Sequence, residues 1–460
     1  MLEQGLRSTT MHSIPLSDIK DCFEGVIPSI IATTDADGLP NVSFLSQVTM
    51  VDEEHIALSN QFFSKTIQNV QATGSATLLV VDARYGHQFV LELEFLKSEY
   101  TGELFERMST QIQAIGGQVG LGHVMALRSA DIYKVATCRK VSSFQNNEEA
   151  KDTTGKPTRM AAVARLITAV AQSTDADAMI DIVLDGLLSE FGFQSAMVLV
   201  PDSQGEVLST LSSRGYDSVG TGSEIKMGEG IIGLAATQHR PIRISDMSRG
   251  RRIIDAVRAT LDLEQKRIVP LPGLENPQSQ IAAPMLSQNQ FFGVLFAESE
   301  TRFSFTSEDE DALGAIAGHL ATSLRMAEVD SRETDIDTAE PYAIASSSSI
   351  ECDFELKYYE FDDSVFINGE YIIKGVPGRL LMHFLTHFVT SGKSRFSNRE
   401  IRRDQSLRLP ELKDNLETRL ILLRRRLEEK DAPISLLRPE RGRIQLDVRG
   451  TPKLETVPGS

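Results

Sequence analysis

The sequence is poor in cysteine: Cys22, Cys138 and Cys352 stand far apart among 460 residues. An odd, scattered set excludes a disulfide framework and a cysteine-based zinc site, and it is typical of a reducing cytoplasm. No run approaches the roughly 18 uninterrupted apolar residues that a membrane-spanning helix needs. The segment from Met1 to Lys20 lacks the charged start and apolar run of a secretory signal. We therefore expect a cytoplasmic protein that has no membrane partner.

The sequence also lacks the short motifs of the common hydrolases and phosphotransferases. It holds no G-x-S-x-G, no H-E-x-x-H, no P-loop and no kinase signature. We therefore assign no catalytic residue, and any enzymatic activity would depend on a bound cofactor.

Positive charge is in excess only near the C-terminus. The whole chain has 47 basic and 64 acidic residues, a formal net charge of −17. Residues 374–449 hold 18 basic and 10 acidic side chains, a net charge of +8, which leaves −25 on the rest. Because acidic surfaces repel polyanions and basic surfaces attract them, we expect an output module near the C-terminus.

Two polar stretches divide the chain. Residues 142–157 have almost no apolar side chains, and residues 330–349 are acidic and then serine-rich. Neither can bury enough surface to offset the entropy lost on ordering, so both are interpreted as linkers. The result is an α+β multidomain protein. Its predicted parts are modules at 1–141, 158–329 and 350–450 and a tail at 451–460.

The first module is rich in short runs of valine, isoleucine, phenylalanine and threonine, separated by turn signals. Strands at this spacing predict a small barrel. The expected strands are 29–33, 41–47, 55–58, 76–81 and 88–93, and a helix is expected over 102–115.

Three stretches, 37–43 (DGLPNVS), 58–61 (LSNQ) and 65–70 (KTIQNV), together resemble the FMN-binding split β-barrel of the pyridoxamine-phosphate-oxidase-like families. In those families hydroxyl and backbone groups after the third strand, with a basic residue at its turn, hold the flavin phosphate. An ammonium group, hydroxyl donors and a helix N-terminus all suit a phosphate. The resemblance implies FMN as cofactor, and the residues it implies are Ser59, Asn60, Lys65 and Thr66. The alternative for Lys65 is a solvated loop lysine.

In the second module, residues 228–233 (GEGIIG) match G-x-G-x-x-G. A dinucleotide fingerprint needs a buried parallel strand before it, but residues 223–227 alternate polar and apolar as a half-exposed strand does. We therefore expect no dinucleotide site here.

The same glycines belong to a longer pattern. Its pieces, in order, are 228–235 (GEGIIGLA), 240–246 (RPIRISD), 280–285 (QIAAPM), 293–298 (GVLFAE) and 303–309 (FSFTSED). Together they resemble a GAF domain, which implies an α/β sandwich and a small-molecule effector. Such domains usually dimerise through their flanking helices, here near 160–172 and 306–326, so we expect a homodimer.

The third module has the order of a winged helix: strands with an Asn368-Gly369 turn, three helices, and a terminal hairpin. Residues 415–420 (NLETRL) and 423–428 (LRRRLE) resemble the recognition helix of response-regulator-type DNA-binding domains. The resemblance implies DNA as partner. The implied contact residues are Thr418, Arg419, Arg425, Arg426, Arg441 and Arg443.

One face of the expected recognition helix is also compatible with a protein partner. The core-facing stripe is formed by Leu416, Leu420, Leu423 and Leu427. Ile421 and Leu422 take outward positions that are basic in the family. An exposed apolar pair can touch thymine methyl groups, or it can form a protein interface.

His383 and His387 stand one helical turn apart, a spacing that can seat a metal ion. No cysteine or acidic third ligand lies close in sequence. We therefore predict no metal site and expect surface or partly buried histidines.

These modules together predict a cytoplasmic sensory regulator that couples a flavin-type barrel and an effector domain to DNA. The alternative is a flavin-dependent oxidoreductase that is regulated by the other two modules.

Overall fold

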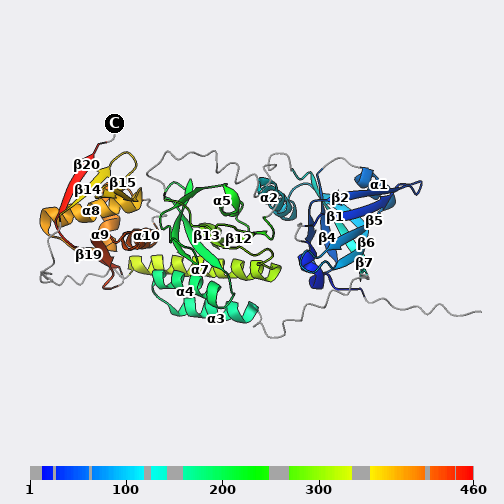
Figure 1. Cartoon of the computed structure of the whole chain (residues 1–460), viewed down its shortest axis with the longest axis horizontal. Helices are drawn as coiled ribbons and strands as arrows, with labels where there is room; N and C mark the ends of the chain where they lie inside the picture. Colours follow the sequence, from blue (N-terminus) through cyan, green and yellow to red (C-terminus); the bar gives the residue numbers. More distant parts are fainter. Residues whose placement is uncertain are drawn as a thin grey trace, which may run out of the picture. The chain divides into compact units, whose positions relative to one another are not determined.

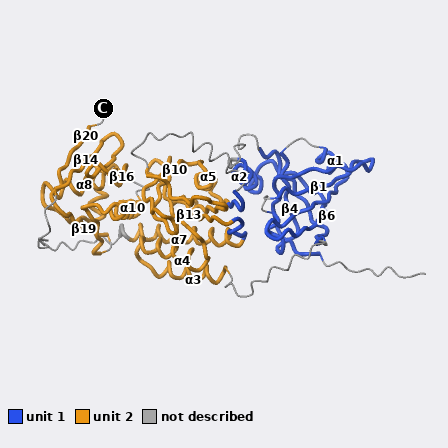
Figure 2. The backbone as a smooth tube through the Cα atoms, in the orientation of Figure 1, with its two compact units in different colours: residues 1–156, 243–260, 302–307 blue, residues 157–242, 261–301, 308–460 orange. Residues whose placement is uncertain are grey.

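The computed structural model describes residues 13–23, 27–61, 65–118, 126–141, 159–247, 269–333, 353–409, 415–440 and 442–458. The chain is a mixed α/β multidomain protein with two compact units, which Figure 2 shows in different colours. One holds residues 1–156, 243–260 and 302–307, and the other holds 157–242, 261–301 and 308–460. The expected linker 142–157 and most of the linker 330–349 lie outside the described residues. Among the described helices, none has the length and apolar character needed to cross a membrane.

The N-terminal domain is built on one curled antiparallel sheet of seven strands (Figure 1). Alternate residues of its strands, such as Ile31, Leu78 and Val80, face a core that also holds Leu16 and Ile19. The strand order is β2-β1-β5-β6-β7-β4-β3. The elements are η1 (Leu16–Phe23), β1 (Ser29–Thr34), β2 (Pro40–Leu45), β3 (Val48–Met50), β4 (His55–Asn60), α1 (Lys65–Thr73), β5 (Ser75–Val81), β6 (Gln88–Glu99), α2 (Glu103–Gln118) and β7 (Ser129–Lys140).

The five expected strands correspond to β1, β2, β4, β5 and β6, and the expected helix to α2. Strands β3 and β7 were not expected. Strand β7 lies between β6 and β4 in the sheet, so it is a central strand.

The second domain has a six-stranded sheet in the order β10-β9-β8-β13-β12-β11. Its strands are β8 (Ser195–Pro201), β9 (Val207–Arg214), β10 (Glu224–Lys226), β11 (Ile242–Ile244), β12 (Ser279–Ser287) and β13 (Gln290–Ser299). Its helices are α3 (Arg159–Gln172), α4 (Ala176–Ser189), α5 (Gly230–Gln238) and α7 (Ser307–Glu333). Figure 1 shows α3, α4 and α7 together on one side of the sheet and α5 on the other.

The glycines of residues 228–233 serve packing in this domain. Strand β10 before them is a three-residue edge strand, as its polar alternation predicted, and not a central parallel strand. A Cβ on Gly233 would lie 2.5 Å from the carbonyl oxygen of Lys226, so only glycine lets α5 approach this close.

Seven apolar residues of the flanking helices α3 and α7 are buried inside one chain. Ala162, Leu166, Val170, Leu313, Ile316, Leu320 and Leu324 are all at most 7% exposed. These seven residues therefore offer no apolar face to a second copy, and the homodimer stays a prediction without their support.

The C-terminal domain packs three helices against two sheets. Its elements are β14 (Phe354–Tyr359), β15 (Ser364–Ile367), β16 (Glu370–Ile373), α8 (Val376–Ser391), β17 (Arg395–Ser397), α9 (Asn398–Arg403), η2 (Gln405–Leu407), α10 (Leu416–Glu429), β18 (Ile434–Leu437), β19 (Arg443–Val448) and β20 (Pro452–Val457). Asn368 and Gly369 have positive φ in the expected turn between β15 and β16. Ser397 caps α9 in a capping box with Glu400, as the sequence predicted.

The segment expected as a tail is part of a sheet. Strand β20 pairs in parallel with β14 from Phe354 opposite Pro452 to Tyr359 opposite Val457. In the strand order β16-β15-β14-β20, strand β20 covers the edge of β14, which would otherwise be unpaired.

Candidate functional site

A cavity of about 440 Å³ opens in the N-terminal domain. Strand β4 and the first turn of α1 supply the stretch that resembled a phosphate site, and β2 and β7 contribute further walls. Three of the four residues predicted for the cofactor line this cavity, namely Ser59, Asn60 and Thr66. The other polar side chains of the lining are Ser43, Ser46, Gln61, Asp131 and Tyr133.

Thr66 is held in place by its neighbours on β2. Its Oγ1 accepts a hydrogen bond from Asn41 Nδ2 at 3.0 Å and lies 2.9 Å from Ser43 Oγ. The Thr66 side chain is buried, so the start of α1 is fixed against the sheet. This positions the first turn of the helix beside the cavity.

Gln61 leaves one polar group without a partner. Ser46 Oγ donates to Gln61 Oε1 at 2.9 Å, whereas Gln61 Nε2 is buried and has no hydrogen-bond partner. Buried donors are nearly always satisfied in proteins, so an orphaned amide in a cavity wall is a ready donor to a bound group.

Lys65 does not line the cavity. Its Nζ lies 3.4 Å from Asp35 Oδ2, and its side chain is 45% exposed. Lys65 is therefore a partly exposed, ion-paired residue at the start of a helix, and its role at a phosphate stays a prediction. It still stands next to Thr66, at the first residue of α1.

Strand β7 contributes two cavity residues that sequence reasoning missed, Asp131 and Tyr133. Burial raises the pKa of the Asp131 carboxyl, although Ser98 Oγ and Ser129 Oγ donate to its Oδ1 at 2.6 and 2.8 Å and oppose the shift. Burial also raises the pKa of Tyr133. The β-branched and aromatic residues of β7 were the available signal.

The hydrogen-bond donors of the cavity lining match the polar part of a flavin mononucleotide. Hydroxyl groups of Ser43, Ser46 and Ser59 and the free amide of Gln61 suit a ribityl chain and a phosphate. The adjacent start of α1 and Lys65 suit the phosphate charge.

A second candidate site is the surface of helix α10. It packs on α8 and β18 of its own domain and also on α4 and β9 of the second domain. Ile421 and Leu422, expected to point outward, are 1% and 3% exposed. Their face is therefore covered within the chain, while the expected core stripe of four leucines is buried as predicted.

Arginines of α10 are paired with acids of α4. Arg425 Nε donates to Asp177 Oδ1 at 2.7 Å, and its Nη2 lies 2.9 Å from Asp181 Oδ1. Arg424 also pairs with Asp177. Arg419 Nη2 donates to the Pro201 carbonyl at 2.7 Å. Burial lowers the pKa of Arg419 to about 10.

Glu429 and Lys374 of the C-terminal domain also contact the second domain. The Glu429 carboxylate accepts from the backbone N–H groups of Gly220 at 3.2 Å and Thr221 at 3.0 Å. Lys374 Nζ lies 2.7 Å from Glu224. The ion pairs of this contact therefore join basic side chains of the C-terminal domain to acids of the second domain, and Glu429 adds hydrogen bonds to the backbone.

The residues predicted for DNA are largely engaged elsewhere in this structure. Arg419 and Arg425 contact the second domain, and Arg426 Nε donates to the Ile372 carbonyl at 2.8 Å. Thr418 is half-buried, and Arg443 Nε lies 3.4 Å from Glu440. Arg441 lies outside the described residues. DNA contact through α10 would require this helix to leave the second domain.

Family models match two parts of the chain. The model described as pyridoxamine 5'-phosphate oxidase matches residues 17–136, and the GAF domain model matches residues 175–324. The chain contains a pyridoxamine 5'-phosphate oxidase-like domain followed by a GAF domain. No curated protein matches the chain.

Solved structures are similar to single domains of the chain. The GAF domain of a phosphoenolpyruvate-protein phosphotransferase from Acinetobacter is 17% identical, with a TM-score of 0.31, over 37% of this chain and 95% of its own. Free methionine-R-sulfoxide reductase from Neisseria meningitidis is 21% identical, with a TM-score of 0.30, over 37% and 91%. An FMN-binding protein from Syntrophomonas wolfei is 16% identical, with a TM-score of 0.24, over 28% and 90%.

Proposed function

We propose that this chain is a cytoplasmic sensory regulator in which the GAF domain controls a C-terminal winged-helix DNA-binding output. The observation that carries the proposal is the docking of α10 on the GAF domain. Arg425 pairs with Asp177 and Asp181, and the apolar face at Ile421 and Leu422 is buried. The sensor therefore covers the helix that would read DNA.

The element order supports a winged helix. Helices α8, α9 and α10 follow the first strands, and the β18–β19 hairpin follows α10 as a wing would. Residues 374–449 carry a net charge of +8, which favours a polyanionic partner.

The docked arrangement is the form that does not bind DNA. A small effector that binds the GAF domain more tightly when α10 is released would shift the population toward the open form. Only the released form presents Arg419 and Arg425 to phosphate, so the apparent affinity for DNA follows the released fraction.

The N-terminal cavity would hold FMN through Ser59, Asn60, Gln61 and Thr66, with Lys65 near the phosphate. Bound flavin supplies reversible electron transfer. The residues of this chain would bind and orient it: the Gln61 amide would donate a hydrogen bond to it, and Thr66 fixes the start of α1 beside it.

Duplex DNA binding at low salt tests the regulatory proposal. The variant Asp177→Ala/Asp181→Ala removes the acids that hold Arg425, and we expect it to bind duplex DNA at least about tenfold more tightly than the wild type. The charge-matched control is Asp185→Ala/Glu190→Ala, whose acids pair with Arg214 and Arg165 inside the GAF domain. Failure of both wild type and the released variant to bind DNA at low salt would overturn the proposal.

A second candidate function is a flavin-dependent oxidoreductase regulated by the other two domains. The polar cavity with its unpaired Gln61 amide favours it. An absorbance spectrum of freshly purified protein tests for flavin. Turnover of a reductant with oxygen then favours the enzyme, whereas a flavin that stays idle favours the sensor.

A further inference from the structure

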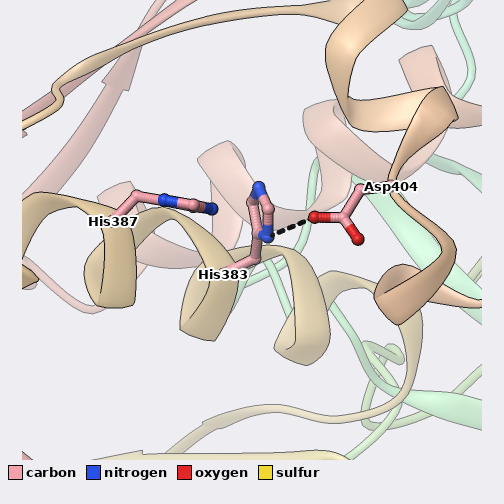
Figure 3. Close-up of side chains that lie close together, drawn as sticks. All are labelled: His383, His387 and Asp404. Atoms are coloured by element: carbon pink, nitrogen blue, oxygen red, sulfur yellow. Dashed lines mark ion pairs between the residues drawn. The ribbon is translucent and has the colours of Figure 1, made fainter.

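Two histidines and a carboxylate converge in the C-terminal domain, and none of them belongs to the sites described above. His383 and His387 stand one turn apart on α8, and Asp404 follows the last residue of α9 (Figure 3). One ligand-type atom from each lies within 4.8 Å of the others. Within the described part of the chain, this is the one set of three such side chains that meets this condition.

The three side chains are held by their surroundings. Asp404 Oδ1 accepts from the Ser406 backbone N–H at 2.8 Å, which leaves Oδ2 to face His383 Nδ1 at 3.3 Å. The His383 side chain is only 10% exposed, and its ring and that of His387 both pack beside Phe396. The two imidazole centroids are 4.5 Å apart.

We propose that His383, His387 and Asp404 bind a divalent transition-metal ion such as Zn²⁺. Imidazole nitrogens and carboxylate oxygens are common ligands of such an ion. Three protein ligands leave the fourth tetrahedral position open for water or a further ligand. Bonds of about 2.0–2.1 Å set tetrahedral donors roughly 3.3–3.4 Å apart. The Nδ1–Oδ2 separation of 3.3 Å already has this spacing, and a ligand atom of His387 lies within 4.8 Å of both partners.

A plain ion pair explains less of the geometry. His55 and Asp52 form such a pair in the N-terminal domain, with Nδ1 at 2.8 Å from Oδ1, and there it stands without a second histidine. At the C-terminal site a second imidazole lies beside the first, and two neutral imidazoles and a carboxylate together offer three lone pairs to one cation.

A metal ion at this site would link two helical segments of the C-terminal domain. The metal would join α8 to the junction of α9 and η2, at Asp404. Two residues earlier, Arg402 pairs with Glu328 of GAF helix α7. Metal occupancy would therefore stiffen the part of the C-terminal domain that contacts the last GAF helix.

Cobalt titration of the full chain tests the site. Protein stripped with a chelator and freed of it is titrated with Co²⁺, which gives visible absorption when it is tetrahedral, and bound Co²⁺ is then displaced with Zn²⁺. We expect one ion per chain. We expect His387→Ala and Asp404→Asn each to weaken binding at least about tenfold, since even groups behind metal ligands typically cost 10–100-fold.

The site variant at Asp404 is chosen to preserve the fold, and a control variant removes a histidine outside the site. Asparagine is as good a helix cap as aspartate, so Asp404→Asn preserves the bond to Ser406. The control His55→Ala removes the histidine of the two-residue pair, and we expect it to bind metal as the wild type does. Absence of tetrahedral Co²⁺ absorption, or equal binding by the wild type and by both site variants, overturns the proposal. The outcome is independent of DNA binding.

Discussion

Glu328 near the end of GAF helix α7 accepts a hydrogen bond from the backbone N–H of Glu417, in the first turn of α10, at 3.0 Å. Helix α10 has no side-chain cap of its own, because Asn415 at the cap position is in the left-handed region and makes no capping bond. The GAF domain therefore supplies the cap of the helix proposed to read DNA. A carboxylate at this end also complements the helix dipole.

Removal of this cap should loosen α10. We expect Glu328→Ala to lower the free energy of unfolding by about 1–2 kcal/mol, the usual cost of a lost cap. Amide hydrogen exchange over residues 416–420 should become faster. The control Asp311→Ala removes an exposed acid from the same helix and should leave this exchange unchanged. Unaltered protection of α10 in Glu328→Ala would contradict the capping role.

The pair of Arg425 and Asp177 should be energetically coupled. A double-mutant cycle with Arg425→Ala and Asp177→Ala should give a coupling energy of about 1–3 kcal/mol, since the groups are in contact and little exposed. Denaturant unfolding of the four proteins provides the measurement. Strictly additive effects would mean that the pair does not hold the domains together.

Much of the fold could be predicted, and the failures have physical causes. Alternation of apolar residues and turn signals located five strands of the first domain, and the capping box at Ser397 located α9. The register of a central strand depends on distant partners, so β7 was missed, and with it Asp131. Strand β20, in the segment expected as a tail, was missed for the same reason, because it gains its hydrogen bonds from β14.

The second apolar face of α10 could be found from the sequence, but the part of the protein that covers it could not. The spacing placed Ile421 and Leu422 opposite the core stripe, and they do lie on a second buried face. Sequence periodicity reports that a face is apolar, not what covers it. Likewise, His383 and His387 were visible as a pair, but Asp404 reaches them only through the path of α9.

The close approach at Gly233 should make that position intolerant of a methyl group. A Cβ there would meet two backbone atoms within 2.7 Å, so we expect Gly233→Ala to cost about 1–3 kcal/mol or more in the GAF domain. The matched control is Gly318→Ala on α7, where the nearest atom would be 3.8 Å away and alanine favours the helix. Thermal unfolding compares the two. Equal melting temperatures would refute the packing role.

Asp131 should reduce stability at neutral pH. Burial raises its pKa in the folded state, so the folded protein prefers the protonated form, and stability is lost as the pH rises through that range. We expect Asp131→Asn, whose Oδ1 can still accept from Ser98 and Ser129, to melt at a higher temperature at pH 7. The gain should shrink as the pH falls toward 4. The control Asp52→Asn should show no gain, because a backbone hydrogen bond from Glu54 lowers the pKa of Asp52. A variant that melts below the wild type at pH 7 would count against this assignment.

Cys138 should be an unreactive thiol with a pH signature of its own. It is 1% exposed in the core of the N-terminal domain, and burial raises its pKa from 9.0 to about 11. Only the thiolate reacts with disulfide reagents, so native protein at pH 8 should leave Cys138 unlabelled while unfolded protein labels it. The unfolded chain loses this proton first, so the contribution to stability is present below pH 9 and is lost between pH 9 and about 11. Other groups also titrate there, so the measurement is the difference between wild type and Cys138→Ala. Rapid native labelling at pH 8, or parallel stability curves for the two proteins across this window, would show that the thiol is not buried as described.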